Sequence, residues 1–206
     1  TALLAGLFKV LQFPVEALEP ERQEGGYGLG PEALERIRAL RPGLLITLDN
    51  GTAAQEPIAA LRSQGVDVIV VDHHHVGEEG LPPALAVINP NRADESFAHK
   101  ELAGVGVAFY LVMALNRALR SQGFFTGIHP EPDLKTLLDL VAVGTIADVA
   151  PLKGLNRIMV KVGLVATEHT RHVGLRTLQE AARLSGRLSA GQVGFQIGPR
   201  INAGGR

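Results

Sequence analysis

The 206-residue sequence contains no cysteine, which excludes a disulfide scaffold and thiolate-bound metal sites. The same absence fits a reducing compartment, and we expect a cytoplasmic protein. No stretch approaches the roughly 20 apolar residues of a membrane span, so we expect no membrane partner. Aromatic residues make up only 4% of the chain and leave little to stack on bases. Because the net charge is −1, any polyanion must be held by a local basic patch or through bound metal.

Hydrophobic residues make up 46% of the chain and charged residues 20%, which is typical of a globular protein with a well-buried core. Short runs rich in Val, Ile and Leu predict strands at residues 44–48, 66–71 and 84–88, with a further candidate at 14–18. Helical patterns lie before and after the first of these runs. This alternation predicts an α/β fold built on a parallel sheet with flanking helices.

The pattern becomes mostly helical from about residue 101. Helices are predicted at 105–120, 133–146 and 156–168, where apolar residues recur at helical spacing. We therefore expect two parts, an α/β sheet part over residues 1–100 and a mainly helical part over residues 101–206.

Two of the predicted strands run directly into an aspartate. Asp49 follows the run 44–48, and Asp72 follows the run 66–71. Parallel strands deliver their carboxyl ends to one edge of the sheet, where ligands bind in α/β folds. A single aspartate in such a place is commonly only a turn former or a helix cap. Two of them at equivalent strand ends predict a shared site.

Three histidines, His73, His74 and His75, follow Asp72 directly. Adjacent side chains of an extended chain point to opposite sides, so one or two of these imidazoles can reach the site while the third points elsewhere. Carboxylates with one or two imidazoles suit Mn²⁺ or Mg²⁺ better than a thiolate-seeking ion. The alternative is a surface loop with three free histidines.

A third carboxylate, Asp148, follows an apolar helix. Negative charge at a helix C-terminus is unfavourable, and a nearby cation would offset that cost. The alternative is a solvated aspartate at a helix end. The terminal stretch 198–206 is rich in Gly, so its exposed amides and guanidinium groups predict a phosphate cradle, with a plain interdomain turn as the alternative. Its candidate phosphate-binding residues are Arg200, Asn202 and Arg206.

The stretch Gly104-Val105-Gly106 offers Gly-x-Gly without a third glycine and does not follow a clear strand. It therefore fails as a dinucleotide-binding fingerprint. We expect it to serve tight helix packing or an amide-lined helix start instead.

Taken in order, these motifs resemble the DHH phosphoesterase superfamily. Asp72-His73-His74 after a buried strand resembles the motif that names the superfamily, Leu48-Asp49-Asn50-Gly51 its second motif, and Gly144-Thr145-Ile146-Ala147-Asp148 its fourth. Within the superfamily, three further stretches resemble the RecJ-type single-stranded-DNA exonucleases, namely residues 88–92, 102–109 and 198–206. The tripeptide alone is unspecific, whereas the ordered set is highly specific and spans essentially the whole chain.

The resemblance implies roles for individual residues. Asp49 would be a carboxylate shared between two metal ions, and His73 and Asp148 would ligate one of them. Asp72 would orient the site, and His74 would lie at the scissile phosphate. Substrate phosphate would be held by Arg200, Asn202 and Arg206, and His75 receives no role.

The resemblance also implies motifs that these 206 residues do not contain. The family's first motif, Asp-x-Asp-Gly after a strand, should precede the opening helix, and a second domain should follow the terminal motif. We therefore expect residues 1–206 to be a DHH domain that is incomplete at its N-terminus and leads to an absent second domain. By itself this piece is expected to bind metal poorly and to cleave little.

The implied activity is that of a hydrolase, a two-metal-dependent 5′-to-3′ exonuclease that releases 5′ mononucleotides in DNA repair and recombination. Its cofactor would be Mn²⁺ or Mg²⁺ and its partner single-stranded DNA, with a helicase or single-strand-binding protein as further candidates. One alternative is a DHH phosphodiesterase for short oligonucleotides or cyclic dinucleotides, which the 198–206 stretch disfavours. The other is a non-catalytic DHH-fold scaffold that binds DNA or protein partners. The acidic residues and His73, all intact, disfavour the scaffold.

Overall fold

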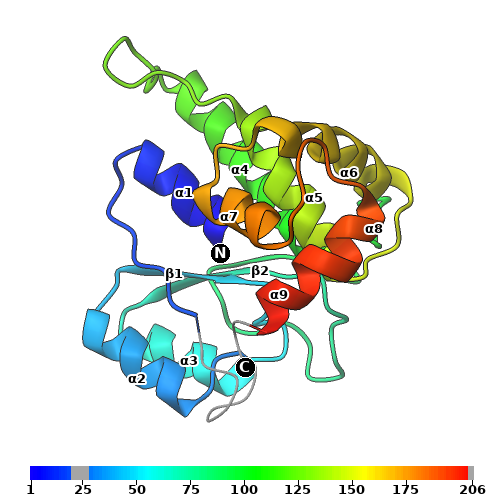
Figure 1. The fold of residues 1–206 in the computed structure, drawn as a ribbon. Coiled ribbons are helices and arrows are strands. Elements are labelled where there is room, and N and C mark those ends of the chain that lie inside the picture. The colour runs from blue at the N-terminus through cyan, green and yellow to red at the C-terminus, as the bar shows by residue number, and fades with distance from the viewer. Residues whose placement is uncertain (20–27, 204–206) are drawn as a thin grey trace.

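The computed structural model describes residues 1–19 and 28–203 (Figure 1). Three strands, β1 (Leu44–Leu48), β2 (Asp67–Val71) and β3 (Ala86–Ile88), form one parallel sheet in the order β1-β2-β3. Helices α2 (Pro31–Leu40) and α3 (Gln55–Ser63) cover the face of the sheet that lies below it in Figure 1. The predicted parallel sheet with flanking helices is confirmed.

The face covered by α2 and α3 is held by an aliphatic cluster. Ile37 of α2 and Ile58 and Leu61 of α3 pack with alternate side chains of β2, Val68 and Val70. All five side chains are at least 97% buried. The alternation follows from the two-residue period of a strand, so the side chains between these point to the other face.

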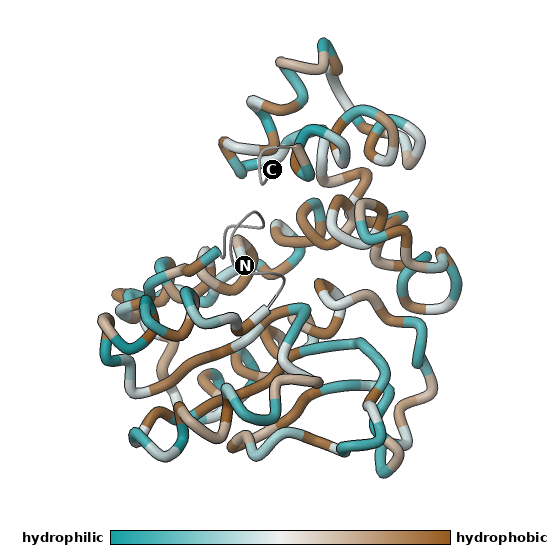
Figure 2. The backbone as a smooth tube through the Cα atoms, turned by 90° about the horizontal axis from the view of Figure 1, so that it is seen from below, coloured by the Kyte–Doolittle hydropathy of each residue, from teal (hydrophilic) through white to brown (hydrophobic). Residues whose placement is uncertain are grey.

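The opposite face of the sheet is covered by α1 (Ala2–Val10), α4 (Gly104–Ser121) and α5 (Leu138–Ala147), the last preceded by the 3₁₀ turn η1 (Leu134–Leu137). Their shared core includes Leu7, Val112 and Val141, and Val71 joins it from the sheet. Figure 2 shows the strands and the inner helices as mainly hydrophobic and the loops at the sheet edge as mainly hydrophilic. The sheet is therefore the middle layer of this half of the molecule.

A second helical layer lies against α5. It comprises α6 (Gly154–Ala166), η2 (Thr167–His169), α7 (Val173–Ala181), α8 (Ala190–Gln192), the π-helical turn η3 (Val193–Ile197) and α9 (Gly198–Ala203). α6 approaches α5 so closely that a Cβ atom on Gly163 would lie 2.0 Å from the Leu138 carbonyl oxygen. Leu164, Leu175 and Ile197 close the core between these helices. No described helix is long and apolar enough to cross a membrane.

Two local predictions are wrong. Residues 14–18 form no strand, because Pro14 cannot donate to a ladder and only Val15 and Leu18 are even partly buried. The terminal stretch, expected to be a turn or loop, is helical as far as Ala203. Gly198 is buried where this helix packs on α5, and a Cβ atom there would be in ordinary contact with Ala147 Cβ at 3.6 Å.

Candidate metal centre

Three polar residues lie in one row at the carboxyl edge of the sheet. The last residues of the three strands, Leu48, Val71 and Ile88, are register partners, so the residues that follow them are aligned as well. The backbone ladder continues one step further, because Asp49 N–H donates to Val71 O at 2.9 Å and Asp72 N–H donates to Ile88 O at 3.0 Å. The row consists of Asp49, Asp72 and Asn89.

Asp49 is turned toward its neighbours by a tight loop. Its φ of 63° is left-handed, a conformation that aspartate tolerates better than most residues. Asn50 Nδ2 donates to Leu48 O at 3.0 Å and Thr47 Oγ1 donates to Asn50 O at 2.9 Å, which fixes the loop. Gly104, at the start of α4, leaves room for the Asp49 carboxylate, because a Cβ atom there would lie 2.2 Å from Asp49 Oδ1.

His73 joins Asp49 to Asp148, although Asp148 belongs to a different layer. His73 Nε2 lies 3.1 Å from Asp49 Oδ1 and 3.7 Å from Asp148 Oδ2. Asp148 reaches this position as the residue that caps the C-terminus of α5. The ring of His73 is 19% exposed, so the group is sheltered but open on one side. The structure therefore brings Asp49, His73 and Asp148 together.

The electrostatics of the metal-free cluster reflect this proximity. The hydrogen bond with Asp49 raises the pKa of His73, and this outweighs the opposing effect of burial. Burial also raises the pKa of Asp148, and the positive charge of His73 offsets part of that increase. Two carboxylates around one imidazole at a helix C-terminus therefore form an environment that favours added positive charge.

Asp72 lies behind this cluster and is 1% exposed. Its Oδ1 accepts hydrogen bonds from the N–H groups of His73 at 2.8 Å and His74 at 3.3 Å, and its Oδ2 accepts from Thr52 N–H at 3.0 Å. Burial acts to raise the pKa of Asp72, but the hydrogen bonds from Thr52, His74 and His73 together outweigh burial and lower it. Asp72 is thus an ionised anchor for the segment that carries the histidines.

His74 is the more open of the two imidazoles. Its Nδ1 lies 2.6 Å from Asp72 Oδ1, and its side chain is 55% exposed. His75, to which the sequence assigns no role, is also exposed. A substrate group can therefore reach His74 from solvent.

The residues present fit a divalent cation. Asp49, His73 and His74 each offer one ligand atom, and these atoms lie within 4.8 Å of one another. Asp148 adds a second carboxylate at the His73 nitrogen. Oxygen and imidazole ligands without sulfur suit Mn²⁺ or Mg²⁺.

The predicted phosphate-binding residues are not joined to this cluster by the hydrogen bonds of the described part of the chain. Arg200 is exposed on α9, and its Nη1 donates to Gln196 O at 2.6 Å. Asn202 is exposed further along the same helix. Arg206 lies outside the described residues. The expected cradle is therefore a helix in its described part rather than a loop of free amides.

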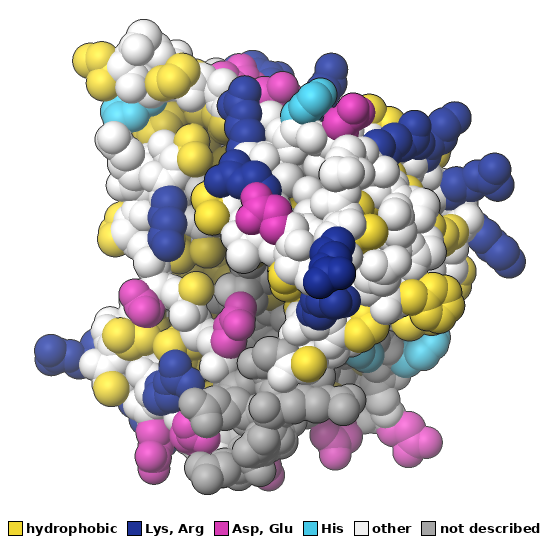
Figure 3. Space-filling view, viewed as in Figure 1, with side chains coloured by type: hydrophobic (Ala, Val, Ile, Leu, Met, Phe, Trp, Pro, Cys, Tyr) yellow, Lys and Arg dark blue, Asp and Glu magenta, His cyan; other side chains and the backbone are white. Residues whose placement is uncertain are grey.

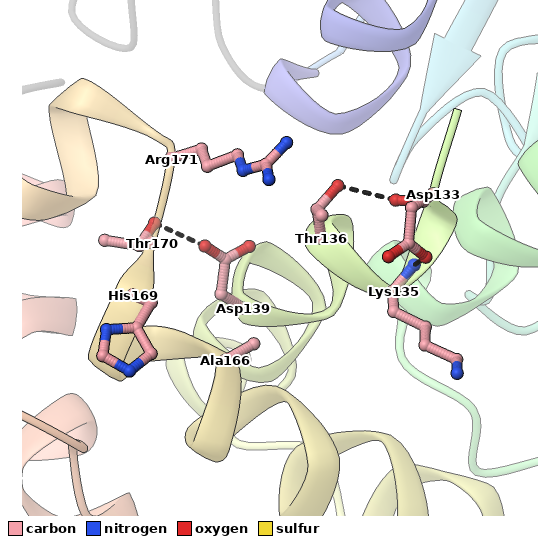
Figure 4. Close-up of a pocket in the computed structure, with 8 residues that line it drawn as sticks. All are labelled: Asp133, Lys135, Thr136, Asp139, Ala166, His169, Thr170 and Arg171. Carbon is pink, nitrogen blue, oxygen red and sulfur yellow. Dashed lines mark hydrogen bonds between the residues drawn. The ribbon is translucent and has the colours of Figure 1, made fainter. Parts of the chain in front are cut away.

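A hollow of about 290 Å³ lies away from this cluster, between η1, the start of α5 and the segment 166–171 (Figure 4). Its buried carboxylate, Asp139, accepts a hydrogen bond from Thr170 Oγ1 at 2.5 Å. Lys135, His169 and Arg171 point in different directions in Figure 4 and do not converge on one point. This hollow therefore lacks the converging groups of the Asp49–His73–Asp148 cluster.

Comparison with known proteins defines the class to which this fold and cluster correspond. The DHH family, N-terminal domain, matches residues 1–145, and the chain belongs to this family.

The similarity extends to individual relatives. The chain is 46% identical over 195 residues to the single-stranded-DNA-specific exonuclease RecJ of Escherichia coli (strain K12), which covers 93% of this chain and 34% of that protein. It is 39% identical over 207 residues to the RecJ of Thermus thermophilus, with 100% and 28% covered. The chain thus spans about a third of the length of the curated relatives it matches. The resemblance to RecJ-type exonucleases is confirmed.

Solved structures give the same result. A crystal structure of exonuclease RecJ bound to manganese has a TM-score of 0.83 at 40% identity and covers 100% of this chain and 49% of that chain. The RecJ of Thermus thermophilus in complex with Mn²⁺ has a TM-score of 0.75 at 38% identity, with 98% and 27% covered. The fold described above is therefore that of the matched parts of these proteins.

The sequence assigned no role to several residues that shape the site, although the stretch 88–92 forms part of the family resemblance. Thr52 and Asn89 are buried behind the histidines, and Asn91 contacts the same segment from β3's exit. The pattern of a polar residue after a strand could have drawn attention to Asn89 as it did to the two aspartates. Gly104 was assigned to helix packing or a helix start, and its function of making room for Asp49 had no signal in the sequence.

Proposed function

We propose that this chain forms the metal-binding core of a two-metal-dependent hydrolase that degrades single-stranded DNA in the 5′-to-3′ direction and releases 5′ mononucleotides. The observation that carries the proposal is the convergence of Asp49, His73 and Asp148, which come from β1, β2 and α5. The RecJ relatives, which are named for activity on single-stranded DNA, support the substrate class. Relatives solved with Mn²⁺ and Mg²⁺ support these ions as cofactors.

In this proposal Asp49 is shared between two metal ions, and His73 and Asp148 ligate one of them. When bound, such a pair would lower the pKa of a bound water and neutralise charge on the phosphoryl group. Asp72 holds the backbone N–H groups of both histidines and so fixes the direction of their rings. The exposed ring of His74 contacts the scissile phosphate.

The distribution of charge supports a polyanionic substrate despite the net charge of −1. Residues 101–206 contain 12 Lys and Arg against 7 Asp and Glu, whereas residues 1–100 contain 8 against 14. On the face shown in Figure 3, most Lys and Arg side chains lie over the helical layer in the upper part of the view. In our proposal Arg200, Asn202 and Arg206 add phosphate contacts from the end of this basic half.

The wider biological setting is part of the same proposal. We assign the full-length protein to DNA repair and recombination in the cytoplasm, where it would act with a helicase or a single-strand-binding protein. The absence of cysteine supports a reducing compartment.

The direct test uses the full-length protein and single-stranded DNA labelled at either end. We expect 5′ mononucleotides to be released from the 5′ end only when Mn²⁺ or Mg²⁺ is present. Asp49→Ala should reduce turnover by more than the ~10–100-fold that loss of an outer metal contact costs. Asp67→Ala is the matched control, because Asp67 is exposed at the other end of β2. Unchanged turnover in Asp49→Ala would contradict the shared-metal role.

The two alternatives give different results in the same system. A phosphodiesterase for short substrates would cleave dinucleotides or cyclic dinucleotides faster than long single strands. A non-catalytic scaffold would bind DNA without cleaving it, and calorimetric titration would detect no tight binding of two Mn²⁺ ions.

A further inference from the structure

The third residue in the row of strand ends is an amide. Asn89 follows β3 as Asp49 and Asp72 follow β1 and β2, and it is 3% exposed. Its Nδ2 donates to Thr52 Oγ1 at 3.0 Å and to the His74 carbonyl at 2.8 Å. Its Oδ1 accepts from Asn91 N–H at 2.8 Å, which closes an Asx turn around Pro90.

The Asx turn aims a second amide at the neighbouring peptide. Asn91 Nδ2 donates to the His73 carbonyl at 2.6 Å. Pro90 fixes the φ angle in the middle of the turn, and Lys100 Nζ donates to the Pro90 carbonyl at 2.5 Å. Two side chains on one short, braced turn therefore hold two successive carbonyls of the histidine segment.

These side-chain hydrogen bonds take the place of the backbone hydrogen bonds between β2 and β3, the last of which is made by Asp72 N–H. Beyond β2 the chain has no strand partner among the described residues, yet its partly buried N–H and C=O groups still need partners. Asp72 accepts from the N–H groups of His73 and His74, and the two asparagines donate to their carbonyls. All four backbone polar groups of this dipeptide are thus bonded to side chains.

The rings of His73 and His74 lie side by side, an arrangement that an extended backbone does not allow. Adjacent side chains of a strand point to opposite sides, whereas the rings of His73 and His74 lie with centroids 4.8 Å apart and planes inclined by 60°. The backbone must bend after Asp72 for both rings to share one side of the sheet edge. The hydrogen bonds of the asparagines stabilise that bend.

We propose that Asn89 and Asn91 are positioning residues that hold the His73–His74 backbone so that both imidazoles face the metal centre. The inference rests on the proposed function, since it concerns how the ligand set is presented. It assigns a role to the Asn89-Pro90-Asn91 stretch. Neither asparagine contacts metal or substrate in this assignment.

The test substitutes Asn91, which is only partly buried, so that the fold is preserved. In the full-length protein, Asn91→Ala should weaken Mn²⁺ binding by ~10–100-fold, the usual cost of losing an outer contact that orients a ligand. Asn91→Gln keeps the amide donor and should recover part of the lost affinity. Asn116→Ala is the matched control, because Asn116 is a buried asparagine on α4 that donates to Glu131.

Mn²⁺ affinity by calorimetry, the melting temperature, and kcat and KM on single-stranded DNA are measured for each variant. Lower Mn²⁺ affinity in Asn91→Ala, but not in an equally destabilised Asn116→Ala, supports the inference. Wild-type affinity in Asn91→Ala, or an equal loss in Asn116→Ala, overturns it and leaves the proposed function intact. A wild-type protein that neither binds Mn²⁺ nor cleaves DNA overturns both.

Discussion

Gly104 provides the sharpest test of the site, because a glycine without a Cβ atom leaves the space that the Asp49 carboxylate occupies. A Cβ atom at this position would lie 2.2 Å from Asp49 Oδ1 and 3.0 Å from Asp49 Cγ. Gly104 is the first residue of α4 and has no left-handed backbone, so alanine introduces a methyl group without backbone strain. Gly104→Ala therefore isolates one steric contact.

The size of the effect follows from the distances. To restore ordinary contact, Asp49 Oδ1 must retreat from 2.2 Å to at least 3.4 Å, a shift of about 1.2 Å. Metal–ligand distances tolerate only about 0.2 Å. We expect Mn²⁺ affinity to fall at least tenfold, or about 1.4 kcal/mol. Overpacking costs about 1–3 kcal/mol of stability, and the better helix propensity of alanine returns up to about 1 kcal/mol.

The assay is calorimetric Mn²⁺ titration of the full-length protein together with urea unfolding. Gly106→Ala is the control, since it adds the same methyl group two residues along α4, where the added Cβ would lie 2.6 Å from Leu102 Cδ1 in the core. That variant should lose stability yet bind Mn²⁺ like the wild type. The reasoning is refuted if Gly104→Ala also binds Mn²⁺ with wild-type affinity.

Two further predictions concern the framework of the site. The lowered folded pKa of Asp72 means that its carboxylate stabilises the fold above its ordinary pKa of 3.8, and that this contribution is lost as the pH falls toward the folded pKa. The difference in unfolding free energy between wild type and Asp72→Asn should therefore be constant above about pH 5 and shrink as the pH falls below about 4 in urea titrations, and a difference that stays constant down to about pH 2 would contradict this reasoning. Gly163→Ala should destabilise the protein by about 3 kcal/mol or more, because the new methyl group meets the Leu138 carbonyl at 2.0 Å. Gly174→Ala, with nothing within 4 Å, should be neutral or up to about 1 kcal/mol stabilising in the same urea titrations, because alanine has the better helix propensity.

The elements that the sequence predicted well are those whose burial is set by their own residue pattern. The runs 44–48 and 66–71 are strands, and α4 lies within one residue of its predicted bounds, because their apolar periods match the layers they join. The predictions that were wrong concern segments whose structure depends on tertiary contacts. Residues 14–18 have strand-like composition but find no strand to pair with among the described residues, and the start of the terminal stretch adopts a helix where it packs on α5.

The grouping of Asp49 with the Asp72–His73 segment was predictable because strand ends converge in a parallel sheet, whereas the place of Asp148 was implied by the family resemblance. The structure places Asp49, His73 and Asp148 together, while their roles as metal ligands stay predictions. The residues that support them were not predictable, because the Asn89 and Asn91 bonds depend on the register of β3 beside β2. Likewise, the space above Gly104 depends on where α4 begins relative to β1.

The position of Asp148 has a consequence for how the molecule comes apart. Asp49 and His73 are fixed to the sheet, whereas Asp148 ends α5, which packs on the sheet through Val141 and on the outer helices through Ala142 and Val143. A cation bound jointly by these residues cross-links the two halves and has no equivalent in a partly opened state. At about one hundred times its Kd, such a cation would suppress local opening between sheet and helices by about 2.7 kcal/mol. Cation binding at this centre would therefore also stabilise the packing of the helices against the sheet.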